Sequence, residues 1–196
     1  MEAPMRQLEE MLVSTGLAMK GDLNALMTSL AGPSALDGLC GAEADARGEA
    51  QELAFEAMEA GSAAQARKLA KRALRLHPDC VDALMVMADL DARTPREMIE
   101  ATQKAVAAGE RSLGEKFIRE NTGHFWLLLE TRPMMRAMEQ LALLLRGQGI
   151  RMDAIRIYER MLELNPNDNQ GVRDPLLGLY LEAGDLKGAG RLLKKY

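Results

Sequence analysis

The segment "QELAFEAMEAGSAAQARKLAKRALRLHPD", residues 51–79, has a second version in "MEQLALLLRGQGIRMDAIRIYERMLELNPND", residues 138–168. The two segments match at one constant offset, which pairs Leu53 with Leu141 and Gly61 with Gly149. The same offset also pairs Ala54 with Ala142, Ala66 with Ala154, and Pro78 with Pro166. Repetition on this scale is typical of arrays in which each unit is one supersecondary motif.

A shorter step of about 34 residues relates further segments. This step pairs Leu53 of the first unit with Met87 of the second. It also pairs Leu141 with Leu176 and Gly149 with Gly184, which relates the third unit to the fourth. Four units are therefore predicted between residues 46 and 196. The second and fourth units follow the pattern less closely than the first and third.

Each unit reads as two short helices. Gly61 suits the end of one helix, and Ser62 with Gln65 three residues later forms a capping box that begins the next. Thr94, Pro95 and Glu97 give the same signal in the second unit. Helix-forming residues dominate the composition and strand formers are few, so an all-α fold is expected.

The pattern resembles the tetratricopeptide repeat (TPR) family, through Ala142, Ala154, Tyr158 and Pro166, although Met138 stands where a tryptophan is common. More narrowly, it is similar to bacterial TPR proteins of unassigned function, which are distantly similar to the suppression-of-tumorigenicity type. The resemblance implies a TPR-like α-solenoid of about four helix pairs and protein binding, and it carries no enzymatic activity.

Two regions interrupt the repeats. Residues 1–31 are expected to form an N-terminal helical region with helices near 4–20 and 23–30, followed by a linker at 32–45 within a stretch rich in Gly, Ala and Asp. An insertion at about residues 110–132 separates units two and three. In it, Ser112 and Glu115 predict a capped helix that ends at Gly123.

The insertion leads into "GHFWLLLETRPMMRA", residues 123–137, which contains the only tryptophan. Helical spacing predicts that Phe125, Trp126 and Leu129 share one face and fill the break between repeats. A cofactor-binding role is the alternative. Thr131 and Pro133 are expected to begin the following helix.

The TPR resemblance implies that the first helix of each unit lines a concave groove. The expected groove residues, with Asp82 beside them, are Gln51, Phe55, Met58, Met85, Asp89, Arg136, Glu139, Leu143 and Arg146. Such a groove suits a peptide or helix of a partner protein, and an ordinary solvated surface is the alternative. Gln51 and Phe55 replace the Lys and Asn of the family's carboxylate clamp, which disfavours chaperone tails as ligands.

Two more surfaces are candidates. A basic stripe in the second helix of unit one suits RNA or an acidic protein, or is simply solvated: Arg67, Lys68, Lys71, Arg72 and Arg75. An apolar stripe near the C-terminus predicts a homodimer: Leu186, Ala189, Leu192 and Leu193.

The remaining signals narrow the function classes. The net charge of −4 gives no general attraction to nucleic acid, which is therefore a disfavoured partner. Cys40 and Cys80 form no metal motif, and no nucleotide or hydrolase motif is present, so we expect no metal, cofactor or enzymatic activity. No membrane-length apolar run or signal peptide is found, and a cytoplasmic protein is expected. The leading hypothesis is a scaffold or adaptor. The alternatives are a structural or regulatory subunit that acts by homo-oligomerisation and, third, an RNA-associated factor.

Overall fold

The computed structural model describes residues 42–196, and these form nine α-helices with two short 3-10 turns. The helices are α4 (Ala42–Met58), α5 (Ala63–Leu76), α6 (Val81–Asp91), α7 (Pro95–Leu113), α8 (Glu115–Asn121), α9 (Arg132–Gly147), α10 (Arg151–Leu164), α11 (Arg173–Glu182) and α12 (Leu186–Lys195). The turns η1 (Phe125–Leu127) and η2 (Leu129–Thr131) lie between α8 and α9. The expected all-α fold is confirmed for this part of the chain.

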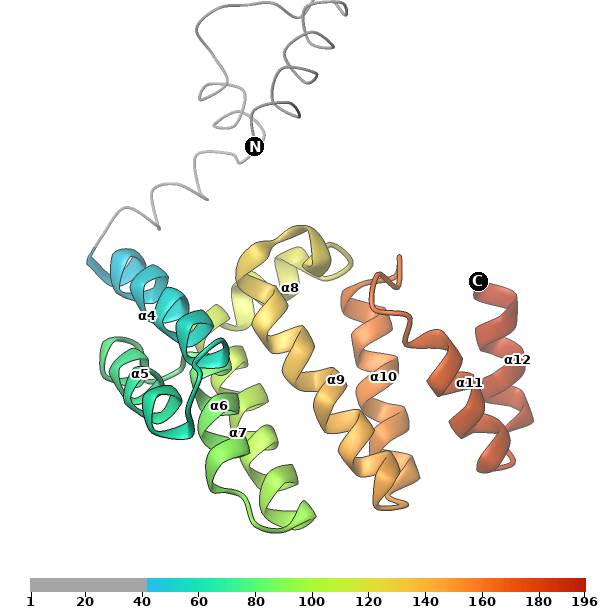
Figure 1. The fold of residues 1–196 in the computed structure, drawn as a ribbon. Coiled ribbons are helices and arrows are strands. Elements are labelled where there is room, and N and C mark those ends of the chain that lie inside the picture. Colours follow the sequence, from blue (N-terminus) through green and yellow to red (C-terminus); the bar gives the residue numbers. More distant parts are fainter. Residues whose placement is uncertain (1–41) are drawn as a thin grey trace, which may run out of the picture. The chain divides into compact units, whose positions relative to one another are not determined.

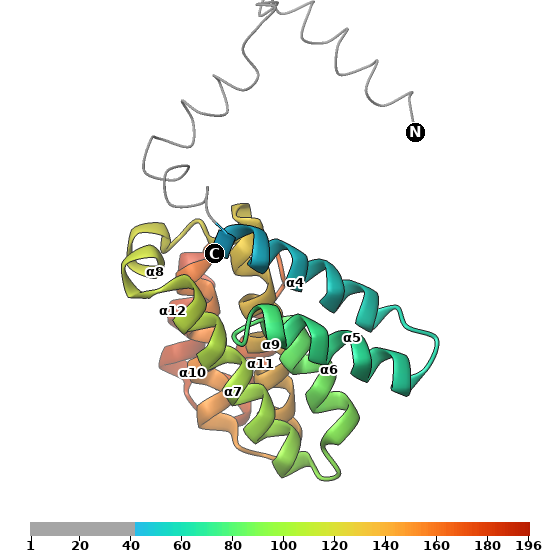
Figure 2. The same ribbon diagram turned by 90° about the vertical axis from the view of Figure 1, so that its left-hand side faces the viewer.

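The helices pack largely in sequential pairs (Figure 1). Helix α6 packs on α5 and α7, α9 packs on α7 and α10, and α11 packs on α10 and α12. Helices α6 and α9 also contact each other and lie on one side, while α7 and α10 lie on the other, as the turned view of Figure 2 shows. The first helices of successive pairs therefore share one side.

Small side chains set the spacing of the helices. Ala66, Ala70 and Ala73 on α5 are buried in a core with residues of α4 and α6, as their spacing predicted. Gly109 of α7 lies where an added Cβ would be 2.8 Å from the Met134 side chain of α9. A second, larger core joins α9, α10 and α11 and contains bulkier Met, Leu and Tyr side chains.

Two predicted helix starts are confirmed. The Ser62 hydroxyl accepts a hydrogen bond from the Gln65 amide at 3.3 Å, and the Thr94 hydroxyl accepts one from the Glu97 amide at 3.2 Å. The Glu97 carboxylate accepts from the backbone N–H of Arg93, one residue before the cap, at 2.6 Å. Each start satisfies backbone donors that the first helical turn leaves unpaired.

Two predictions about boundaries are corrected. Helix α4 begins at Ala42, so the last residues of the 32–45 linker are helical. The proposed N-terminal helices and Cys40 lie outside the described residues. The predicted helix start at Ser112 is wrong, because α7 continues through it and Gly114, with a φ of 81°, separates α7 from α8. The Ser112 hydroxyl instead lies 2.9 Å from His77 Nε2.

The aromatic segment differs from the predicted helical face. Phe125 is fully buried in the larger core, Trp126 is half-buried, and Leu129 is exposed, so the three do not share one buried side. The segment forms η1 and η2, and the single Thr131 hydroxyl hydrogen is shared between the carbonyl of Phe125 and, at 2.8 Å, that of Leu128. Helix α9 follows at Arg132 with proline in its first turn, as expected.

Candidate interaction surface

A buried carboxylate joins three helices on the side shared by the first helices. Asp82 of α6, which is 3% exposed, accepts a hydrogen bond from Gln51 Nε2 of α4 at 2.6 Å. It also pairs with the guanidinium of Arg136 of α9. This chain of contacts places the predicted groove residues Gln51 and Arg136 together, although they come from helices far apart in sequence.

Helical spacing places the other predicted groove residues on the same side. Residues three, four or seven positions apart share a helix face, so Gln51, Asp82 and Arg136 fix the faces of α4, α6 and α9. Phe55, Met58 and Leu143 on these faces are 42–47% exposed, Asp89 is exposed, and Met85 is half-buried. We call this surface the first-helix face; it comprises Gln51, Phe55, Met58, Asp82, Met85, Asp89, Arg136, Glu139, Leu143 and Arg146.

Helix α11 is tied to the same surface. Arg146 of α9 lies 3.7 Å from the Glu182 carboxylate of α11, which also pairs with Arg151 of α10 at 3.4 Å. Glu182 was missed in the sequence, where an exposed glutamate near a helix end gives no signal of its own.

The charges of the first-helix face are unevenly paired. Arg136 and Arg146 both have acidic partners, Asp82 and Glu182. No cation pairs with Asp89 or Glu139 among the described residues. Partial desolvation by the surrounding helix atoms raises the pKa of the Asp89 carboxyl, although its side chain is reached by solvent. The unpaired charge on this surface is therefore negative.

Two buried polar side-chain atoms behind this surface have no hydrogen-bond partner within residues 42–196. They are the Tyr158 hydroxyl of α10 and Oε1 of Gln170, which precedes α11. Gln170 Nε2 donates to Glu139 at 2.7 Å and to the carbonyl of Met135 at 3.3 Å. Burial raises the pKa of the Tyr158 phenol, the Arg146 charge lowers it, and the Glu139 charge raises it. Gln170 was also missed, because it lies between helices and outside the repeat pattern.

The basic stripe of α5 is partly neutralised. Arg67 pairs with Asp91 at 2.7 Å, and Arg72 pairs with Glu49 at 3.3 Å. The other three, Lys68, Lys71 and Arg75, are exposed and pair with no acid in residues 46–196. The structure thus leaves a smaller cationic surface than the sequence suggested.

The predicted apolar stripe of α12 is divided. Leu186 and Leu193 are 72% and 65% exposed, whereas Ala189 is buried and Leu192 is half-buried against the larger core. Ala189 is therefore not part of an exposed stripe, because it packs where α12 meets α11. A shallow hollow lies beside this helix, lined by Arg173, Asp174, Leu177, Leu192, Leu193 and Tyr196.

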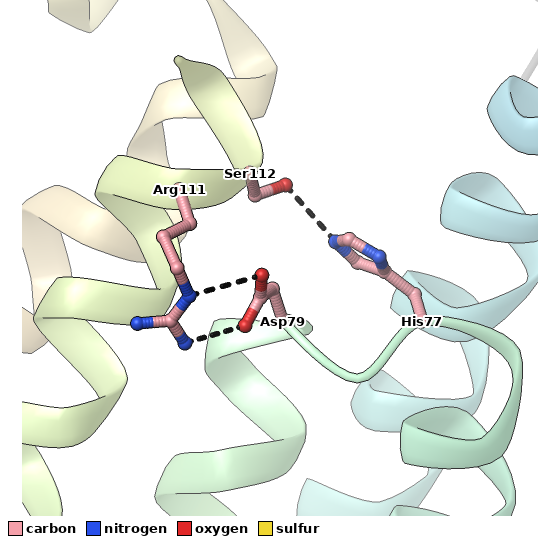
Figure 3. A network of polar contacts seen from close by, with 4 residues as sticks. All are labelled: His77, Asp79, Arg111 and Ser112. Atoms are coloured by element: carbon pink, nitrogen blue, oxygen red, sulfur yellow. Dashed lines mark hydrogen bonds and ion pairs between the residues drawn. The ribbon is translucent and has the colours of Figure 1, made fainter. Parts of the chain in front are cut away.

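A polar cluster connects the α5–α6 turn to the end of α7 (Figure 3). His77 Nε2 lies 2.9 Å from the Ser112 hydroxyl, while the Asp79 carboxylate accepts two hydrogen bonds from Arg111, at 2.6 and 3.3 Å. Figure 3 shows the carboxylate directed at the guanidinium and not at the imidazole. The cluster therefore ties two helix pairs together and does not have the Ser–His–Asp relay geometry.

Searches of the described residues for a membrane-spanning helix and a metal site, and of the chain for similar known proteins, gave no match. Within residues 42–196 no helix combines the length and apolar character needed to cross a membrane. The same residues contain no group of three His, Cys, Asp or Glu side chains placed to bind a metal ion. No protein-family model matches the chain, and no curated protein matches it.

Proposed function

We propose that the chain is a TPR-like α-solenoid that acts as a scaffold or adaptor and binds a peptide or helix of another protein across the first-helix face. The observation that carries the proposal is the Gln51–Asp82–Arg136 contact, which aligns three first helices on one side. A surface built from successive aligned helices offers side chains at regular intervals to an elongated ligand.

The apolar residues of this surface support ligand binding. Phe55 and Met58 of α4 and Leu143 of α9 are 42–47% exposed, although both helices bury other apolar side chains in the two cores. Burying apolar surface contributes about 25 cal/mol per Å², so several such anchors provide a driving force for association. Met adapts its shape to different partners, which suits a binding surface.

Selection from random peptides of about a dozen residues, displayed on phage and panned on the immobilised chain, tests the proposal. Peptides that are enriched should bind Phe55→Ser/Leu143→Ser about tenfold more weakly than wild type. The matched control, Leu129→Ser/Met152→Ser, removes two exposed apolar residues of η2 and α10 and should bind normally. Failure to enrich any peptide, or binding that ignores the Phe55 and Leu143 changes, would contradict the proposal.

Self-association through α12 is the second candidate. It is favoured by exposed Leu186 and Leu193, together with exposed Leu181 on the adjacent α11. Sedimentation of wild type and of Leu186→Glu/Leu193→Glu at tens of micromolar, about the range where a weak dimer is detected, tests it. A dimer that the double substitution converts to monomer supports this candidate, and a monomeric wild type rules it out.

A further inference from the structure

We propose that the first-helix face selects a segment with basic and apolar side chains, and that Glu139, Gln170 and Tyr158 together hold one lysine ammonium or arginine guanidinium of that segment. The inference rests on the proposed function and states which class of ligand it takes.

The pairing of charges argues against an acidic ligand. A carboxylate that approached Arg136 or Arg146 would compete with Asp82 or Glu182, which already pair with these guanidinium groups. Like charges would also be brought together at each arginine, which is unfavourable. Asp89 and Glu139 offer the opposite situation, because each carries a negative charge that no described cation pairs with.

The hydrogen-bond geometry around Glu139 argues for a ligand group that donates hydrogen bonds and accepts none. The two bonds from Gln170 Nε2, to Glu139 and to the Met135 carbonyl, set the orientation of the amide. The reverse orientation would direct Oε1 at two acceptors, so Oε1 stays an acceptor that lacks a donor. The Tyr158 hydroxyl, on a residue that is 1% exposed, also lacks a partner and can accept.

A lysine ammonium has three donors and no acceptor. It therefore complements the Glu139 carboxylate, Gln170 Oε1 and the Tyr158 oxygen, whereas a carboxylate or carbonyl would add another acceptor. The Arg146 charge acts on the Tyr158 phenol and lowers its pKa, and the Arg146 guanidinium is paired with Glu182 at 3.7 Å. Both unpaired atoms are buried, so Tyr158 and Gln170 must turn outward, with rearrangement of the two Gln170 hydrogen bonds, when the cation binds.

Apolar side chains accompany the two acidic positions. Met85 lies one turn before Asp89 on α6, and Leu143 lies one turn after Glu139 on α9. A ligand that crosses from α6 to α9 thus meets an acid and an apolar residue on each helix. This arrangement predicts alternating basic and apolar side chains in the ligand.

The peptides enriched from the random library provide the first test. We expect Lys or Arg together with Leu, Ile or Phe, and we expect a synthetic copy with every Lys and Arg changed to Glu to lose binding. Affinity of the basic peptide should fall about tenfold in Glu139→Gln and stay unchanged in Glu110→Gln, an exposed control on α7. Enrichment of acidic peptides that still need Phe55 and Leu143, or full affinity in Glu139→Gln, would overturn the inference and leave the proposed function standing.

Tyr158→Phe provides the second test, because a merely structural hydroxyl and a ligand anchor predict different results. Removal of a buried hydroxyl without a partner should leave the melting temperature unchanged or raise it, while the basic peptide binds more weakly. Tyr180→Phe is the matched control: its hydroxyl donates to Glu159, so its loss should lower the melting temperature and spare peptide binding. A lowered melting temperature in Tyr158→Phe, or unchanged peptide affinity, would contradict the role of Tyr158.

Discussion

Asp82 of α6 is buried beneath Arg136 of α9, and their ion pair joins two helices separated by α7, α8 and the aromatic segment. The sequence separation of 54 positions makes this a long-range contact. Gln51 of α4 donates to the same carboxylate oxygen, so one acid organises three first helices. The arginine expected to meet a partner thus has a role in holding the fold.

Arg136→Met should lower the free energy of unfolding by about 1–3 kcal/mol, because it leaves the buried Asp82 carboxylate with Gln51 alone. The matched control is Arg156→Met, which breaks an exposed pair with Asp153 and should cost less than about 1 kcal/mol. Urea denaturation measures both values. Equal costs for the two substitutions would show that the Asp82 contact contributes no more than a surface pair.

Phe125 should contribute more to stability than Trp126. Phe125→Ala removes a fully buried ring from the larger core and should cost about 3–5 kcal/mol. Trp126 is half-buried, with the Arg132 guanidinium 5.1 Å from its ring centre, so Trp126→Ala should cost less. Thermal melts of the two variants compare their losses of stability. A larger drop in melting temperature for Trp126→Ala than for Phe125→Ala would contradict the prediction.

Two glycines of α12 predict opposite effects of the same change. At Gly188 an added Cβ would lie 2.4 Å from the Asp185 carboxylate and 2.7 Å from the Tyr180 ring, so Gly188→Ala should destabilise by about 1–3 kcal/mol. Nothing lies within 4 Å of a Cβ at Gly190, so Gly190→Ala should stabilise the helix by about 0.5–1 kcal/mol. Differential scanning calorimetry distinguishes them; stabilisation by both would mean that α12 does not pack closely on α11.

His77 should make stability depend on pH in the mildly acidic range. Burial, and then the Arg47 charge, lower the pKa of its imidazole below the usual 6.5, while the Asp79 charge raises it. The unfolded chain therefore binds the proton more readily, and stability should fall as pH drops below about 6.5. His77→Gln should reduce the loss of melting temperature between about pH 7.5 and 5.5. His124→Gln, at the exposed second histidine, should retain it, and an unchanged pH dependence in His77→Gln would contradict the assignment.

Local signals in the sequence predicted the helices well. Alanine spacing in α5, the caps at Ser62 and Thr94, and the proline near the start of α9 all act over one or two helical turns, and the structure confirms them. The predicted helix start at Ser112 was wrong because the Ser112 hydroxyl contacts His77 of the preceding helix pair. A contact between residues this far apart in the chain cannot be seen in a short segment of sequence.

The candidate surface was only partly predictable for the same reason. Repeat spacing identified residues such as Phe55 and Leu143 by their place in a helix. The pairing of Arg136 with Asp82 and the unpaired atoms of Tyr158 and Gln170 depend on how helices meet in space. Our proposal of a basic ligand is based on these contacts, which the sequence does not reveal, whereas the position of the surface followed from the repeat spacing.

Methyl NMR of methionine tests most directly whether the first-helix face is the binding surface. The chain, labelled with methyl-13C methionine, would be titrated with an enriched peptide, and each signal would be assigned by a single Met→Leu change. We predict that the Met58 and Met85 signals shift, while that of Met152, an exposed methionine of α10, does not. Shifts at Met152 with Met58 and Met85 unaffected would show that the ligand binds elsewhere and would contradict the proposed function.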